Sequence, residues 1–177
     1  AEGRILVSTF ASNLHRIQQL LDLSEKYGRR VALYGRSIET NVMLAIEHGL
    51  LRVRPELFVD VESVAGRPRR EVTILASGAQ GEPRSALSRI AAGEEGIPFR
   101  LTEGDTAILS ASAIPGNEVA VGAVLDALAL QGVRTFQGER VHASGHASQE
   151  EQRQMIETVM PRHFIPVHGE GRHLVQH

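Results

Sequence analysis

Residues 72–93 read VTILASGAQGEPRSALSRIAAG, and this stretch decides the fold. Its first part, Val72–Ala76, is rich in aliphatic and β-branched residues and predicts a buried strand. A loop of small and polar residues follows, and apolar residues then recur at helical spacing through Leu87 and Ile90. Pro83 suits the first turn of that helix, and the final glycine can end it. A strand, a polar loop and a helix in this order are typical of a parallel α/β sheet.

The same pattern recurs on both sides of this stretch. Strands are predicted at residues 5–8, 31–34 and 107–110. Helices are predicted from about residue 14 to a stop at Gly28, with Ser12 or Asn13 as the N-cap, over residues 37–50, and over residues 117–130. The last of these is apolar on most sides, so we expect it to be well buried. We therefore predict an α/β fold with a doubly wound, mainly parallel sheet flanked by helices, in which residues 52–70 form a surface excursion.

Composition limits the function classes. The 177 residues are 42% hydrophobic and 23% charged with a formal net charge of −2, so no overall basic surface points to nucleic acid. Cysteine is absent, which excludes disulfides and thiolate metal sites. No signal-like start and no long apolar run is present, and we expect a cytoplasmic protein that does not bind a membrane.

The loops after the predicted strands are candidates for a binding site. In an open α/β sheet, ligands bind beyond the carboxyl ends of the strands. The loop at residues 77–83 is longer than a turn requires, and Gln80 and Glu82 have no evident structural role, so a ligand site and a simple turn both remain open. For residues 35–37 a tight turn is the favoured interpretation. The Gly-Lys-Ser/Thr ending of an NTPase phosphate loop is missing, and no Gly-x-Gly-x-x-Gly turn follows the first strand, which disfavours an NTPase and a dinucleotide-binding enzyme.

Histidines are concentrated near the C-terminal end, where six of the eight fall between residues 142 and 177. The run HASGHAS at residues 142–148 contains a glycine, so a loop is expected rather than the helical zinc pair of metalloproteases. Ser148 and Glu151 form the pattern of a capping box at the start of a helix. Backbone N–H groups, the Ser144 hydroxyl and two imidazoles just before that helix would suit a phosphate. A capped turn with incidental histidines is the alternative.

His168 ends a short apolar segment and is followed by glycine, a position suited to a metal ligand. One histidine is not a site, because a catalytic zinc needs at least three protein ligands. No His-x-His or His-x-Asp-His cluster exists in the chain to supply the others. An exposed histidine without a ligand role is therefore the alternative interpretation of His168.

Five segments, taken in order, resemble ribonuclease J, a β-CASP member of the metallo-β-lactamase superfamily. They are residues 8–16 (STFASNLHR), 77–83 (SGAQGEP), 114–118 (IPGNE), 142–147 (HASGHA) and 166–170 (PVHGE). The resemblance covers nearly the whole chain. It implies a β-CASP domain over residues 1–141, and a phosphate-binding loop, helix and strand over residues 142–177 that return to a metallo-β-lactamase domain. The zinc motif and the first β-CASP acid of that family are missing and would lie upstream of Ala1.

The resemblance implies a role for each candidate residue. His146 is expected to be catalytic, and His168 to be a zinc ligand. The substrate phosphate is expected to lie against His142, Ala143, Ser144, Gly145 and His146. The loops that carry Gln80, Gly81, Glu82 and Ser112 are expected to line an RNA channel, because the carboxyl ends of parallel strands meet at one edge.

The implied activity is metal-dependent hydrolysis of RNA phosphodiester bonds, as a 5′–3′ exonuclease and endonuclease, in an intact enzyme that holds two zinc ions. The implied substrate is single-stranded RNA with a 5′-monophosphate, and the intact enzyme is expected to be a homodimer. With only one plausible ligand, this chain alone is expected neither to hold the zinc ions nor to cleave RNA. The alternative is an RNA-binding or scaffold module without catalysis.

Overall fold

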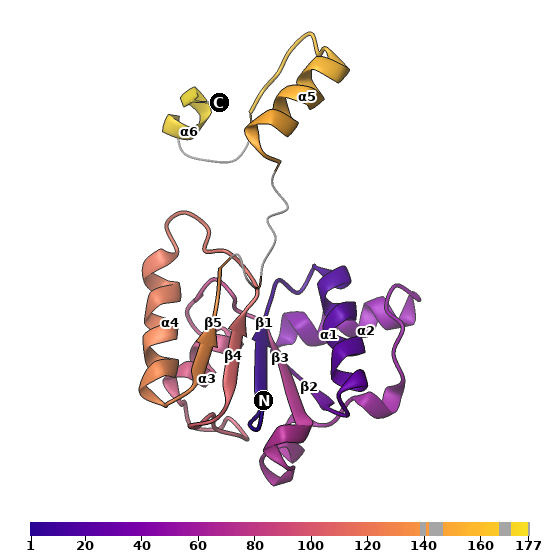
Figure 1. Ribbon diagram of the computed structural model, residues 1–177, viewed down its shortest axis with the longest axis vertical. Coiled ribbons are helices and arrows are strands. Elements are labelled where there is room, and N and C mark those ends of the chain that lie inside the picture. The colour runs from indigo at the N-terminus through magenta and orange to yellow at the C-terminus, as the bar shows by residue number, and fades with distance from the viewer. Residues whose placement is uncertain (139–140, 142–146, 167–170, 177) are drawn as a thin grey trace. The chain divides into compact units, whose positions relative to one another are not determined.

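The structure is a computed structural model, and it describes residues 1–138, 141, 147–166 and 171–176 (Figure 1). The chain divides into two compact units, Ala1–Ala143 and Ser144–His177. Unit 1 holds the sheet, and unit 2 holds two helices. Each unit is described by itself.

Unit 1 is built on a five-stranded sheet in the order β2-β3-β1-β4-β5. Its strands are β1 Ile5–Ser8, β2 Arg30–Tyr34, β3 Val72–Ala76, β4 Thr106–Leu109 and β5 Arg134–Phe136. Every neighbouring pair is parallel. The predicted α/β class with a parallel sheet is confirmed, and the four predicted strands agree with the observed ones to within one residue at each end. The edge strand β5 was not predicted.

Helices cover the two faces of the sheet, because successive side chains of a strand point to opposite faces. On one face, Val7 and Leu75 pack with α1 Leu14–Lys26 and α2 Arg36–Glu47. On the other face, Leu6 and Ile74 pack with α3 Ala86–Ala92 and α4 Glu118–Leu130. Figure 1 shows the two helix pairs on opposite sides of the strands. Each fully buried leucine or isoleucine contributes roughly 1.5–3 kcal/mol.

The helix starts follow the capping rules, with one difference. The Asn13 side chain accepts a hydrogen bond from Arg16 N and caps α1, as predicted. Ser85 caps α3 in the same way and accepts from Ser88 N. Pro83 was expected inside the first turn of this helix, but it lies in the turn before the cap. Because the Ser85 hydroxyl caps the helix, α3 begins at Ala86, after Pro83.

Helix α4 differs from the expectation of a well-buried helix. Val121, Val124 and Leu128 are buried, but Val119 is 85% and Leu130 is 90% exposed. A helix on the outer layer of a doubly wound sheet buries only the face that meets the sheet. Apolar composition alone does not distinguish such a helix from one that is covered on all sides.

The excursion between α2 and β3 consists of three short 3-10 helices. They are η1 Pro55–Leu57, η2 Val61–Gly66 and η3 Arg69–Glu71. Leu57 belongs to the core on the α1 and α2 face, whereas Val64 belongs to the core on the α3 and α4 face. The excursion is irregular, as expected, but it contributes buried side chains to both cores.

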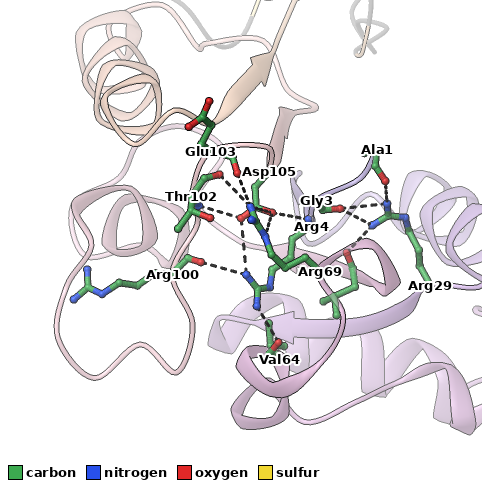
Figure 2. A network of polar contacts seen from close by, with 11 residues as sticks. Ala1, Gly3, Arg4, Arg29, Val64, Arg69, Arg100, Thr102, Glu103 and Asp105 are labelled. Atoms are coloured by element: carbon green, nitrogen blue, oxygen red, sulfur yellow. Dashed lines mark hydrogen bonds and ion pairs between the residues drawn. The ribbon is translucent and has the colours of Figure 1, made fainter.

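A polar network closes the amino edge of the sheet, where the strands begin (Figure 2). Asp105 is 0% exposed and accepts hydrogen bonds from Arg4 N at 2.6 Å and from Thr102 N at 3.0 Å. Its carboxylate also forms an ion pair with Arg69, with Nη2 and Oδ1 2.9 Å apart. The Arg4 guanidinium donates to Val64 O at 3.2 Å. Burial lowers the pKa of Arg4, and the nearby Asp105 carboxylate opposes that shift.

Unit 2 contains α5 Gln149–Val159 and α6 Gly171–Gln176. The predicted capping box is confirmed: the Ser148 side chain accepts from Glu151 N, and the Glu151 carboxylate accepts from Ser148 N at 2.7 Å. This bond holds the pKa of Glu151 below its ordinary value. Neither helix has a buried residue within the described part of unit 2. No helix among the residues that the structure describes is long and apolar enough to cross a membrane.

Candidate functional site

The candidate site lies at the carboxyl edge of the sheet, which we define as the edge where the five strands end. Because all strands are parallel, the loops after β1, β2, β3 and β4 leave the sheet at this edge. Two loops carry the predicted residues Gln80, Gly81, Glu82 and Ser112. They are residues 77–83 and 112–117, and both start at this edge. The expectation that a parallel sheet brings them to one edge agrees with the strand register, since Ser8 pairs with both Ala76 and Leu109.

Gln80 joins these two loops. Its side-chain Nε2 donates to Ser112 O at 2.9 Å, and its Oε1 accepts from Ile114 N at 2.7 Å. Asn117 Nδ2 donates to the same oxygen at 3.5 Å. The residue is only 3% exposed, so both ends of the amide are used inside the protein. Gln80 therefore has a structural role that its sequence position did not reveal, and it fixes the spacing of the two loops.

The neighbours of Gln80 shape the same loop. Glu82 is exposed, and its Oε2 accepts from Gln80 N at 3.2 Å. Gly81 has φ +69, and a Cβ on it would lie 2.6 Å from the backbone carbonyl carbon of Ala120 in α4. Only glycine therefore allows this close approach of loop and helix. Ser112 is exposed, with its carbonyl bound to Gln80. Four predicted residues, Gln80, Gly81, Glu82 and Ser112, are thus brought together at one edge.

A second contact brings the chain before His142 to this edge. Ser110, directly after β4, donates from its hydroxyl to Val141 O at 2.6 Å. The Ser110 carbonyl accepts from Arg16 Nη1 at 2.7 Å. Neither residue was among the predicted site residues. The sequence shows that Ser110 follows a strand and that Arg16 lies in the first turn of a helix. It does not show the contact between Ser110 and Val141, which are 31 residues apart.

The remaining predicted residues lie outside the described part of the chain. They are His142, Ala143, Ser144, Gly145, His146 and His168. Their described neighbours are Val141, bound to Ser110, and Ser148, the N-cap of α5. Within residues 1–138, 141, 147–166 and 171–176, no group of three or more His, Asp or Glu side chains could hold a metal ion. The described side chains therefore do not fit a zinc centre by themselves.

We predict that Gln80→Ala lowers the free energy of unfolding by about 1–3 kcal/mol, because Ser112 O and Ile114 N lose their buried partner. Gln80→Glu should be at least as destabilising at neutral pH, since a carboxylate oxygen would face the Ser112 carbonyl. Urea unfolding followed by circular dichroism measures both. Gln19→Ala is the control: among the described residues this exposed glutamine reaches only His15, one helical turn away, and its loss should change stability by less than about 0.5 kcal/mol. Equal stability of Gln80→Ala and wild type would contradict the bridging role.

Comparison with known protein families gives two matches that together span most of the chain. Residues 2–128 match the family described as ribonuclease J, β-CASP domain. Residues 136–177 match the family described as Zn-dependent metallo-hydrolase RNA specificity domain. The first match contains the sheet up to β4 and both loops that Gln80 joins, and the second contains the residues from the end of β5 onward.

Individual relatives agree with the family matches. The chain is 42% identical to ribonuclease J of Helicobacter pylori strain J99 over 179 aligned residues, covering 100% of the chain and 26% of that relative. It is 46% identical to ribonuclease J of Thermus thermophilus and 38% identical to ribonuclease J2 of Bacillus subtilis, covering 98% and 97% of the chain. These alignments cover 30% and 31% of those relatives. The chain thus spans between a quarter and a third of the length of these relatives.

Proposed function

The chain belongs to the ribonuclease J family of β-CASP proteins, and on that premise we propose that it forms the RNA-binding β-CASP part of a nuclease that hydrolyses RNA phosphodiester bonds. The proposal includes both exonucleolytic removal from the 5′ end and endonucleolytic cleavage. One observation carries it: Gln80 ties together two loops that resemble the family at the carboxyl edge, and Ser110 brings the chain to that edge just before His142. The activity is proposed to take place in the cytoplasm.

We propose that residues 142–146 bind a phosphate of single-stranded RNA. Backbone N–H groups, a serine hydroxyl and imidazoles are all donors, and these residues precede the capped start of α5 in the sequence. The proposed site accepts a 5′-monophosphate, and a triphosphate is larger and more highly charged than such a site would accept, which gives a physical reason for preferring monophosphorylated ends. His146 would donate a hydrogen bond or a proton to the reacting phosphate or the departing oxygen.

The loops at the carboxyl edge would line the RNA channel. Glu82 and Ser112 are exposed there, and Gly81 allows the loop to pass close to α4. Gln80 is buried, so its proposed part is to hold the two loops at a fixed separation rather than to touch RNA. A fixed spacing matters because a misplaced substrate reacts more slowly even when it binds well.

Zinc is proposed to belong to the intact enzyme rather than to this chain alone. The matched family over residues 136–177 is one of Zn-dependent metallo-hydrolases. Because the described residues contain no group of three ligands, His168 would contribute one ligand and the rest of the whole protein the others. The proposed centre has two ions. The intact enzyme is proposed to act as a homodimer.

We predict that this chain alone retains less than one zinc per molecule after dialysis and does not cleave single-stranded RNA, because one ligand does not make a zinc site. Elemental analysis and a cleavage assay on a labelled RNA measure this. Stoichiometric, tightly bound zinc together with metal-dependent cleavage would contradict the division of ligands.

The RNA-binding part of the proposal has its own measurement. Fluorescence anisotropy of the chain with 5′-monophosphorylated, 5′-triphosphorylated and 5′-hydroxyl RNA of the same sequence should rank the monophosphorylated RNA first. Equal affinity for the three ends would remove the proposed selectivity, and the absence of any RNA binding would contradict the proposed function of this chain.

A further inference from the structure

A pocket of about 800 Å³ lies at the carboxyl edge beside the ends of β2 and β3. It is lined by the start of α2, by the loop 77–83 and by the start of α3. Three arginines line it, Arg36, Arg84 and Arg89, and so do Glu39 and Glu82. None of these arginines was singled out as a site residue from the sequence.

The pocket contains strong hydrogen-bond donors without a described partner. Glu39 Oε1 accepts from Gly35 N at 3.0 Å, and Glu82 Oε2 accepts from Gln80 N, so each carboxylate has one oxygen bound to the backbone. Arg89 is paired with Glu94, with Nε and Oε2 2.8 Å apart. By contrast, the guanidinium groups of Arg36 and Arg84 have no hydrogen-bond or ion-pair partner among the described residues, and each offers five N–H donors.

The backbone at Arg84 points to a role for its side chain. Ser85 N donates to Glu82 O at 3.0 Å across Pro83 and Arg84. Proline fixes a negative φ at the first central position, and Arg84 has φ +62 at the second. This is a type II turn, whose second central position favours glycine or asparagine. An arginine that occupies a strained position and has no partner among the described residues is available for a ligand.

The distance from the pocket to the end of β4 favours a single-stranded nucleic acid over a small anion. The strand order places β2 at one end of the edge and β4 three strands away, and Ser110 anchors Val141 at the end of β4. Three strand spacings amount to roughly 14 Å, a distance that a few nucleotides of single strand can span. The loop 77–83 lies between the two places, since Glu82 lines the pocket and Gln80 binds Ser112.

We propose that Arg36 and Arg84 bind a backbone phosphate of the single-stranded RNA, at a nucleotide displaced along the carboxyl edge from the proposed end-binding loop. Planar guanidinium groups match phosphate oxygens through two parallel hydrogen bonds. Ser37, Thr40 and Asn41, which also line the pocket, offer hydroxyl and amide groups to the ribose 2′-OH. This inference rests on the proposed RNA-binding function and adds a second phosphate site to it.

The test uses the whole chain, metal-free buffer, and 5′-monophosphorylated RNAs of about two and about ten nucleotides. Arg84→Gly should weaken binding of the longer RNA on the order of ten-fold and equally for different sequences. It should also lower the slope of log K against log salt by about 0.7, as expected for one lost phosphate contact on a single strand. Arg36→Gln should do the same, and neither variant should affect the dinucleotide, which does not reach the pocket.

Stability separates a ligand role from a structural one. Glycine relieves the strained φ at position 84, so the melting temperature of Arg84→Gly should be no lower than that of wild type. The matched control is Arg134→Gln. This exposed arginine lies at the start of β5, at the amino edge of the sheet, and its loss should leave RNA binding unchanged.

Each other outcome has a defined meaning. Unchanged binding of the long RNA by Arg84→Gly and Arg36→Gln, or an equal loss in Arg134→Gln, would overturn the inference and leave the proposed function intact. No RNA binding by wild type would overturn the proposed function and the inference with it. If inorganic phosphate raised the melting temperature of wild type but not of Arg84→Gly, and RNA affinity were unaffected, the pocket would be a small-anion site and the RNA assignment would be wrong.

Discussion

Replacing His146 by alanine in the full-length nuclease is expected to lower turnover roughly 100-fold or more, because a positioned donor to a reacting phosphate would be lost. Zinc content should remain close to that of the wild type. His146 precedes the N-cap Ser148 of α5, a setting suited to an anion rather than to a metal. Single-turnover cleavage of a labelled RNA measures the rate, and elemental analysis measures the zinc.

His168→Ala is expected to behave differently, with a loss of zinc that precedes any kinetic effect. A directly coordinating histidine sets metal affinity, so its removal changes occupancy first. Added zinc should restore part of the activity of His168→Ala and none of the activity of His146→Ala. The control is His163→Ala, because this exposed histidine lies on the same segment and has no proposed role. Zinc loss in His146→Ala with full zinc in His168→Ala would reverse the two assignments.

The sheet and most helices could be predicted because their signals are local. Val72–Ala76 is buried along its whole length, and its sequence is correspondingly apolar. Strand β5 was missed because it is short and outermost in the sheet: Arg134–Phe136 has three residues, of which two are exposed. Neither periodicity nor apolar content marks such a strand.

The site was predictable only to the level of its loops. The parallel order of the strands was sufficient to place residues 77–83 and 112–117 at one edge. The bridge made by Gln80 could not be predicted, because Gln80 and Ser112 are 32 residues apart in sequence and their contact depends on the distance between the two loops. The contact of Ser110 with Val141 could not be predicted for the same reason. Nor could the sequence show that the Arg84 guanidinium has no partner among the described residues.

The largest effect on stability is expected at the amino edge of the sheet. Asp105→Ala should lower the free energy of unfolding by about 3–5 kcal/mol, because it leaves the buried Arg4 and the half-buried Arg69 without their carboxylate. In a unit of this size, the melting temperature should fall by about 10 °C. Asp105 also accepts from Arg4 N, so the start of β1 would lose a buried hydrogen bond. Urea unfolding and thermal unfolding followed by circular dichroism measure the two quantities.

Glu25→Ala is the matched control, since Glu25 also faces an arginine through two nitrogens, Arg54 Nε and Nη2, but at the surface. Its removal should change the free energy of unfolding by less than about 1 kcal/mol, because solvent screens exposed ion pairs. At a temperature where Asp105→Ala remains folded, its RNA affinity should equal that of the wild type, because Asp105 lies at the amino edge and the proposed RNA loops lie at the carboxyl edge of the same strands. An Asp105→Ala variant as stable as the Glu25→Ala control would mean that the network contributes no net stability. A folded Asp105→Ala that bound RNA more weakly would couple the two edges through β1 and β4.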